Sequence, residues 1–174
     1  GKCAYEYRKN LGIELAKEAD VKADLVVPVP DSGVPASLGY AEESGKQFEL
    51  GLIRNHYVGR TFIEPTQNIR SLGVKLKLSS TKTIVKNKSI ILIDDSLVRG
   101  TTCHKIVKML YEAGAKEIHV RIACPEIKFP DFYGVDMPTK KELLAHEKSL
   151  DEMSNYIKAK SLKFLSINGL YKAL

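Results

Sequence analysis

The chain has 174 residues, 44% of them hydrophobic and 28% charged, which excludes a disordered or fibrous protein and suggests one domain with a sizeable core. No apolar run reaches the roughly 20 residues that span a bilayer, and the first ten residues lack the apolar core of a secretory signal. We therefore expect a cytoplasmic protein with no membrane segment. The net charge of +6 suits nucleic acid or a phosphorylated small molecule, but the basic residues are scattered and no nucleic-acid-binding motif accompanies them.

The first third of the chain alternates between helical and strand patterns. Apolar residues at helical spacing predict a helix over 7–19, and the β-branched run at 23–30 predicts a buried parallel strand. Asp31-Ser32-Gly33 has turn and N-cap chemistry, and a helix follows that closes near Gly45. "FELGLI" (48–53) predicts one further strand.

Residues 54–80 mix Gly, Pro, Asn and many cations with little periodicity. A segment of this length without a clear pattern is often a lid or binding loop, and we expect one here. A twisted hairpin with a solvated face is the alternative.

The second half begins with the clearest strand, "KSIILID" (88–94), followed by an amphipathic helix over 101–115 and a strand over 117–125. The last quarter predicts a loop, a helix, a short strand and a terminal helix. The fold class expected is α/β, with a mostly parallel central sheet flanked by helices, and ligands on such sheets gather at the carboxyl ends of strands.

The segment "IILIDDSLVRGTTC" (90–103) contains the residues that indicate a ligand-binding site. Asp94 and Asp95 follow a buried strand, and the next residues lead into a helix whose first amides have no helical partner. Those amides, the helix dipole and the hydroxyls of Ser96, Thr101 and Thr102 suit a phosphate. The carboxylates would repel a phosphate and instead suit sugar hydroxyls and Mg²⁺. The predicted ligand is a sugar phosphate.

The turn after Asp95 matches neither of two common phosphate-binding motifs. Neither a GxxxxGK[ST] nor a GxGxxG pattern is present, which excludes a Walker loop and a dinucleotide fingerprint. A purely structural interpretation would make Asp94 an N-cap and Asp95 a solvated turn residue, although capping needs only one such side chain.

"IILIDDSLVRGTT" resembles the phosphoribosyl-pyrophosphate (PRPP) signature of the type I phosphoribosyltransferase family. Its form "DDSLVRGTT" is similar to that of the amidophosphoribosyltransferases, and "NHYVGRTFIEPTQNIRSLGVKLKL", "VVPVPDSG" and "PEIKFPDFYGVDMPTKKELLAH" resemble their flexible loop, pyrophosphate loop and hood. The resemblance covers nearly the whole chain, with the motifs in the family's order.

The resemblance implies a role for each matching residue. Asp94 and Asp95 would bind the ribose hydroxyls and help hold Mg²⁺, and Ser32 is a weaker metal candidate. Gly33 stands where the family often has a hydroxyl residue, and His56 where arginine is common. The implied PRPP-binding residues are Asp94, Asp95, Ser96, Val98, Arg99, Gly100, Thr101 and Thr102. The implied loop residues are Asp31, Ser32 and Gly33 for pyrophosphate, and Tyr57, Arg60, Thr61, Gln67 and Arg70 for the flexible loop.

The reaction implied is displacement of pyrophosphate from PRPP by ammonia, giving 5-phosphoribosylamine in the first step of purine synthesis. In the family, ammonia comes from glutamine through a glutaminase domain whose nucleophile is an amino-terminal cysteine. Cys3 is not expected to be that nucleophile, so residues 1–174 should form the transferase domain without the glutaminase and use free ammonia at best. Purine nucleotides as feedback inhibitors and a homo-oligomer are further implied.

The three cysteines, Cys3, Cys103 and Cys124, form no metal-binding or disulfide pattern and should be reduced thiols. Some family members carry an iron–sulfur cluster, but Asp131 stands at the place of one cluster cysteine, so no cluster is expected.

Two alternatives stay open. A nucleobase phosphoribosyltransferase would share the PRPP turn and need a base-recognising hood. A regulator with the same fold would sense PRPP or nucleotides while binding nucleic acid, without turnover.

Overall fold

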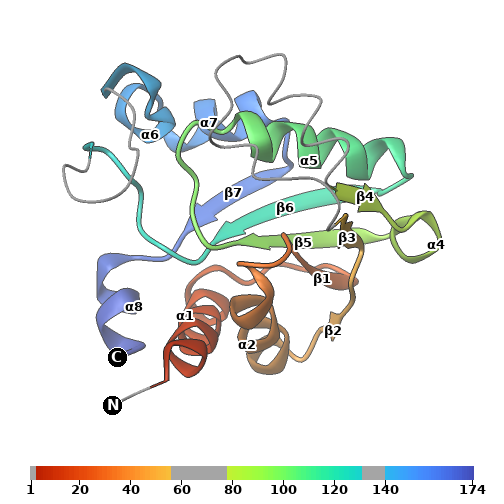
Figure 1. The fold of residues 1–174 in the computed structure, drawn as a ribbon, viewed down its shortest axis with the longest axis horizontal. Helices are drawn as coiled ribbons and strands as arrows, with labels where there is room; N and C mark the ends of the chain where they lie inside the picture. The colour runs from red at the N-terminus through yellow and green to blue at the C-terminus, as the bar shows by residue number, and fades with distance from the viewer. Residues whose placement is uncertain (1–2, 56–77, 131–139) are drawn as a thin grey trace.

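The computed structural model describes residues 3–55, 78–130 and 140–174, and its centre is a five-stranded parallel sheet (Figure 1). The strand order is β2-β1-β5-β6-β7, with all four neighbouring pairs parallel. Its strands are β1 (Leu25–Pro28), β2 (Gln47–Phe48), β5 (Ser89–Asp94), β6 (Glu117–Ile122) and β7 (Ser161–Phe164). β3 (Leu52–Arg54) and β4 (Leu78–Ser80) form a separate antiparallel pair.

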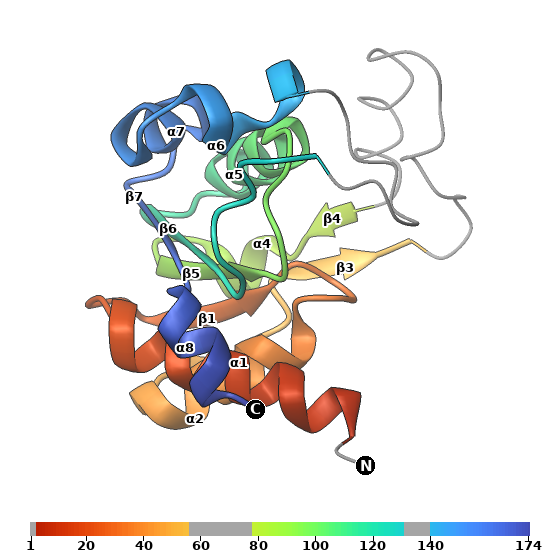
Figure 2. The same ribbon diagram turned by 90° about the vertical axis from the view of Figure 1, so that its left-hand side faces the viewer.

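Helices cover both faces of the sheet (Figures 1 and 2). One face carries α1 (Ala4–Ala19), α2 (Val34–Ser44) and α8 (Ile167–Lys172). The other carries α5 (Thr101–Glu112), α6 (Leu144–Glu147) and α7 (Leu150–Ile157). Two short elements, α4 (Lys82–Val85) and the 3₁₀ turn η2 (Lys140–Glu142), complete the described fold.

Both faces of the central strands are apolar because both are covered. Along β5, Ile91 and Ile93 pack in the cluster with α1 and α2, whereas Ile90 and Leu92 pack in the cluster with α5 and α7, and all four are fully buried. Such two-sided burial explains why the sequence of this strand is a continuous apolar run. The expected α/β class with a mostly parallel sheet is confirmed.

The chain reverses its direction of travel across the sheet between β1 and β5. From β1 it proceeds through α2 to the outer strand β2, and from β5 it proceeds through α5 to β6 on the other side. The loops after β1 and β5 therefore diverge from adjacent strand ends, which is where open α/β sheets bind ligands. The Val29 amide donates to the Ile93 carbonyl at 2.8 Å and holds the two strand ends together.

One local prediction is wrong. The single strand expected over 48–53 is two strands in different sheets, and between them lies Gly51, where a Cβ would be 2.9 Å from a Val85 methyl. The N-cap of α2 is Gly33, the third residue of the predicted Asp31-Ser32-Gly33 turn, and no side chain caps the helix there. The predicted closure at Gly45 is confirmed, with φ at 66°.

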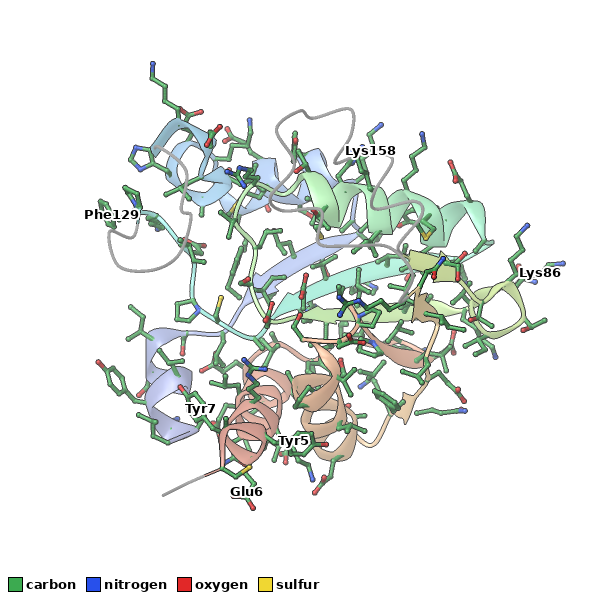
Figure 3. The ribbon with its side chains drawn as sticks, viewed as in Figure 1. Tyr5, Glu6, Tyr7, Lys86, Phe129 and Lys158 are labelled. Atoms are coloured by element: carbon green, nitrogen blue, oxygen red, sulfur yellow. The ribbon has the colours of Figure 1, made fainter. Side chains whose placement is uncertain are left out.

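In the last quarter, two α-helices, α6 and α7, precede the short strand where one was expected. α7 begins with a capping box, in which Ser149 and Glu152 each accept from the other's amide. Its C-cap is Lys158, labelled in Figure 3, whose φ is 60°. The short strand and terminal helix are confirmed as β7 and α8. Within the described ranges, no helix is long and apolar enough to cross a membrane.

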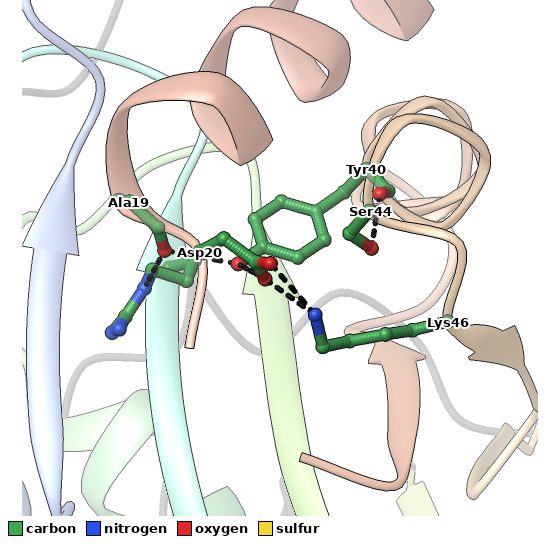
Figure 4. A network of polar contacts seen from close by, with 6 residues as sticks. Ala19, Asp20, Tyr40, Ser44 and Lys46 are labelled. Carbon is green, nitrogen blue, oxygen red and sulfur yellow. Dashed lines mark hydrogen bonds and ion pairs between the residues drawn. The ribbon is translucent and has the colours of Figure 1, made fainter. Parts of the chain in front are cut away.

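A polar cluster, the Tyr40 network, lies between α1, α2 and the sheet (Figure 4). The Tyr40 hydroxyl is 2.9 Å from the Ala19 carbonyl and 3.2 Å from Asp20, and the Lys46 ammonium contacts both Asp20 oxygens at 2.7 and 2.8 Å. Buried Arg121 donates from Nε to the Ala19 carbonyl at 2.7 Å and from Nη1 to Ser161 at 2.9 Å. These polar groups satisfy one another.

Candidate functional site

The acidic pair lies at the carboxyl end of β5. Asp94 is the last residue of the strand, and one of its carboxylate oxygens accepts from the Asp95 amide at 2.8 Å. The Ser96 hydroxyl is 3.3 Å from an Asp95 oxygen. Burial, and secondly the neighbouring charge of Asp95, raise the pKa of Asp94 well above its usual range. A ligand that offers hydroxyl donors or positive charge would stabilise the ionised pair.

The residues from Ser96 to Thr102, the phosphate turn, lead into α5. The N-cap of α5 is Gly100, whose φ of 77° is in the left-handed region, and it offers no side chain to the first amides. Interpreting Asp94 as the N-cap is therefore wrong, since α5 begins at Thr101. Thr101 and Thr102 occupy the first turn, where amide groups without helical partners favour an anion.

The turn is also tied to the C-terminal part of the chain. The Val98 carbonyl accepts from the Leu144 amide at 2.9 Å, and Arg99 Nη2 is 3.6 Å from a Glu142 oxygen. Of the implied PRPP-binding residues, all eight lie on this single segment from Asp94 to Thr102.

The implied pyrophosphate loop follows β1, immediately beside the acidic pair. The Gly33 amide donates to the Val29 carbonyl at 2.9 Å, and a Cβ on Gly33 would lie 2.6 Å from the Ile93 carbonyl oxygen. In this chain the close approach leaves no room for a Cβ at position 33, so a hydroxyl residue would require the backbone to shift. Ser32 is half-buried, and no backbone hydrogen bond from its amide is found among the described residues.

Arg54 is a site residue that the sequence alone did not single out. It is the last residue of β3, and its guanidinium forms an ion pair with the exposed carboxylate of Asp31. Its Nε is buried and has no hydrogen-bond partner in the part of the chain that is described. The available signal was a cation directly before "NHYVGRT", at the point where a strand enters the expected lid.

The expected lid is described only at its ends. Arg54 pairs with Leu78, and Leu52 with Ser80, so the ends form the antiparallel ladder that the hairpin alternative anticipated. The flexible-loop residues Tyr57, Arg60, Thr61, Gln67 and Arg70 lie outside the described residues, as do His56 and Asp131. The lid interpretation stays a prediction.

The donor set at the acidic pair fits Mg²⁺ held largely by its substrate. Mg²⁺ commonly binds through one or two carboxylates together with substrate oxygens, and Asp94 and Asp95 supply two. No group of three or more His, Cys, Asp and Glu able to hold a metal occurs within the described ranges.

The cysteines lie in unequal surroundings: Cys3 is exposed, Cys103 buried and Cys124 partly buried. Burial, with a smaller contribution from Asp95 and Asp94, raises the pKa of Cys124 to about 12. Burial also raises the pKa of Cys103. Both thiols therefore remain protonated beside the acidic pair.

The sequence matches the phosphoribosyl transferase domain over residues 6–159. The chain belongs to the phosphoribosyltransferase domain family. Among its curated relatives, the amidophosphoribosyltransferase of Rhizobium etli is 60% identical over 175 residues, covering 100% of this chain and 35% of the relative. That of Methanocaldococcus jannaschii is 53% identical, covering 100% of this chain and 37% of the relative.

A solved structure agrees with this phosphoribosyltransferase assignment. The glutamine PRPP amidotransferase from B. subtilis, complexed with ADP and GMP, has a TM-score of 0.86 and 51% identity, covering 97% of this chain and 37% of that one. The resemblance to amidophosphoribosyltransferases is confirmed. The chain spans about a third of the length of the relatives it matches.

Proposed function

We propose that this chain is the phosphoribosyltransferase domain of an amidophosphoribosyltransferase and that it binds PRPP at the carboxyl ends of β1 and β5. The observation that carries the proposal is the adjacency of three features: the acidic pair, the phosphate turn and the Gly33 loop. The Val29 amide donates to the Ile93 carbonyl and Gly33 lies close to that carbonyl, so the loop after β1 packs against the end of β5, where the acidic pair begins.

Each part of PRPP has a chemically suitable counterpart. The amides and hydroxyls at the start of α5 hold the 5-phosphate, and Asp94 with Asp95 orients the ribose diol. The pyrophosphate lies toward the Asp31-Ser32-Gly33 loop and the Arg54 guanidinium, which is already beside that loop. In this placement the carboxylates of Asp94 and Asp95 face the ribose hydroxyls, and the Arg54 guanidinium faces the pyrophosphate.

The proposed reaction is attack of ammonia on the anomeric carbon, with departure of pyrophosphate and formation of 5-phosphoribosylamine. As the bond to pyrophosphate breaks, the ribose gains positive charge that Asp94 and Asp95 stabilise, while the leaving group gains negative charge beside Arg54. Asp94 and Asp95 would also hold Mg²⁺, which when bound supplies further positive charge to the pyrophosphate. Neutral ammonia is already nucleophilic, so the chain's main contribution is orientation.

In the relatives, about two thirds of the polypeptide lies outside the matched region, and we propose that a glutaminase domain there supplies the ammonia. We further propose a cytoplasmic homo-oligomer with purine nucleotides as inhibitors, since the B. subtilis relative was solved with ADP and GMP. The iron–sulfur cluster is not part of the proposal.

A pyrophosphate-release assay tests this function. The chain is given PRPP and Mg²⁺ with ammonium in one arm and with free purine or pyrimidine bases in another. Release with ammonium supports the proposal, and release only with a base would make the protein a nucleobase phosphoribosyltransferase. PRPP binding without release in either arm contradicts the activity of this chain and favours the PRPP-sensing regulator.

A further inference from the structure

The phosphate turn is supported from behind by residues that have no assigned role. The Leu144 amide donates to the Val98 carbonyl at 2.9 Å, which fixes the peptide in the middle of the turn. The side chain of Leu144, itself buried, lies against Gly100, because a Cβ built on Gly100 would be 2.6 Å from Leu144 Cδ2. That Cβ would also be 3.2 Å from the Tyr156 ring on α7. The conformation of the turn therefore depends on α6 and α7.

A charged contact supports the same turn from the adjacent 3₁₀ turn η2. The Arg99 side chain is only 22% exposed, and its Nη2 lies 3.6 Å from Glu142 Oε2. Arg99 Nε is buried, and no hydrogen-bond partner is found for it among the described residues. A largely covered guanidinium with an incomplete set of partners needs a fixed counter-charge, and Glu142 is the carboxylate that the structure places beside it.

We propose that Glu142 and Leu144 are positioning residues for the phosphate turn. Leu144 fixes the Val98 carbonyl and the left-handed Gly100, and Glu142 orients the Arg99 guanidinium, so both act on the 5-phosphate through the turn. This inference rests on the proposed function, because it requires the turn to bind the 5-phosphate of PRPP. The site then includes Leu144, which lies more than 40 residues after Val98 in the sequence.

The test separates the two ends of PRPP by using two probes. Ribose 5-phosphate offers the 5-phosphate and diol, whereas inorganic pyrophosphate with Mg²⁺ offers only the other end. We expect Glu142→Gln and Leu144→Ala each to weaken ribose 5-phosphate binding about tenfold, since small misplacements of positioned groups cost up to ~10²-fold. Pyrophosphate binding, measured by the same calorimetry, should stay within about twofold of wild type because its loop follows β1.

Each variant has a matched control. Glu147→Gln removes an exposed carboxylate from the neighbouring helix α6, and Leu162→Ala makes a cavity in the same hydrophobic cluster as Leu144 but on β7. Both controls should bind ribose 5-phosphate as wild type does. Because Glu142 is exposed, its variant should fold even where Leu144→Ala does not.

A double-variant cycle tests the route of action. If Glu142 acts through Arg99, the variant Arg99→Ala with Glu142→Gln should bind no more weakly than Arg99→Ala alone. Ribose 5-phosphate binding that is unchanged in both Glu142→Gln and Leu144→Ala overturns the inference while leaving the proposed function standing. Equal weakening of both probes also overturns it, since that result indicates general destabilisation. Wild type that binds neither PRPP nor ribose 5-phosphate contradicts the proposed function itself, and this inference with it.

Discussion

Two polar regions lie against the same sheet: the Tyr40 network and the loops 29–33 and 94–102, which we call the substrate edge. They differ in how far their polar groups have partners within the protein. In the network, Tyr40, Asp20 and Arg121 have protein partners at hydrogen-bond distance. At the substrate edge, Asp94 carries a raised pKa, and the first amides of α5 have no capping side chain. The polar groups of the Tyr40 network satisfy one another within the fold, whereas those of the substrate edge are the ones that we propose a ligand completes.

The pKa values in the network agree with this distinction. Burial works against ionisation of Asp20, but the Lys46 ammonium, the Val21 amide and the Tyr40 hydroxyl together outweigh it, so the pKa of Asp20 lies below its ordinary value. Asp94 has no cation partner among the described residues, and burial raises its pKa instead. The pKa values of these two carboxylates thus differ because, of the two, only Asp20 is paired with a cation among the described residues.

The largest effect should follow from Gly33→Ala, which tests whether the loop 29–33 must pack against the end of β5. The added Cβ would meet the Ile93 carbonyl oxygen at 2.6 Å and the Val29 carbonyl oxygen at 2.8 Å, and backbone atoms cannot rotate away. We expect a loss of about 3 kcal/mol in the free energy of unfolding, at the upper end of overpacking costs. PRPP binding should also weaken. Chemical denaturation and calorimetry measure the two effects.

Gly45→Ala is the matched control for that glycine. Its φ of 66° is unfavourable for alanine, but no atom lies within 4 Å of the added Cβ. The cost should be about 1 kcal/mol, with PRPP affinity unchanged. Equal costs for the two glycines would contradict the close approach that we infer between Gly33 and the end of β5.

The next effect concerns Asp94→Asn, which should stabilise the free protein while removing its PRPP binding. In the folded protein the pKa of Asp94 is raised above its ordinary value of 3.8, so wild type loses stability as the pH rises from about that value through the raised pKa. The asparagine side chain of the variant does not ionise, so its stability has no such dependence on pH. The variant's advantage should be absent in strong acid and reach about 1–2 kcal/mol near neutrality, the scale of a poorly compensated buried polar group.

Chemical denaturation of wild type and variant across a pH series measures how the stability difference changes with pH. A difference that does not change with pH, or a variant less stable than wild type at neutral pH, contradicts the account of an acidic pair destabilised by burial.

The sequence predicted the substrate edge better than it predicted the surroundings that shape it. The sequence reveals Asp94 and the turn after it because these residues are contiguous. The apolar run before them indicates a buried strand, which places Asp94 at the end of that strand. Arg54 and Glu142 were missed because ion pairs across 23 or 43 residues leave no local pattern. The break between β2 and β3 was missed because the two segments pair with different strands, β1 and β4, and such partners are not visible in the local sequence.

A smaller effect is expected in the Tyr40 network. Tyr40→Phe removes the hydroxyl that reaches the Ala19 carbonyl and Asp20, and it leaves the ring in place. We expect a loss of about 1 kcal/mol in stability, the net value of a typical hydrogen bond. The KM for PRPP should not change. A rise in KM without a loss of stability would contradict the assignment of this network to the fold.

The smallest effect should come from Lys46→Met. The ion pair with Asp20 is partly open to solvent on the Asp20 side, where 44% of the side chain is exposed. Surface pairs of this kind contribute about 0–1 kcal/mol, and salt weakens them. Stability measured at low and high salt should differ less in the variant than in wild type. A salt dependence equal to that of wild type would show that the pair contributes nothing.

The most direct test of the central claim is calorimetric titration of PRPP into wild type and Asp95→Asn, with and without Mg²⁺. Asp95→Asn removes one charge from the pair and keeps the shape of the side chain. If the acidic pair holds the ribose diol and the metal, PRPP should bind wild type more tightly with Mg²⁺ than without it, and the variant should lose most of that difference. Mg²⁺-dependent PRPP binding that is the same in both proteins would contradict the role assigned to the acidic pair.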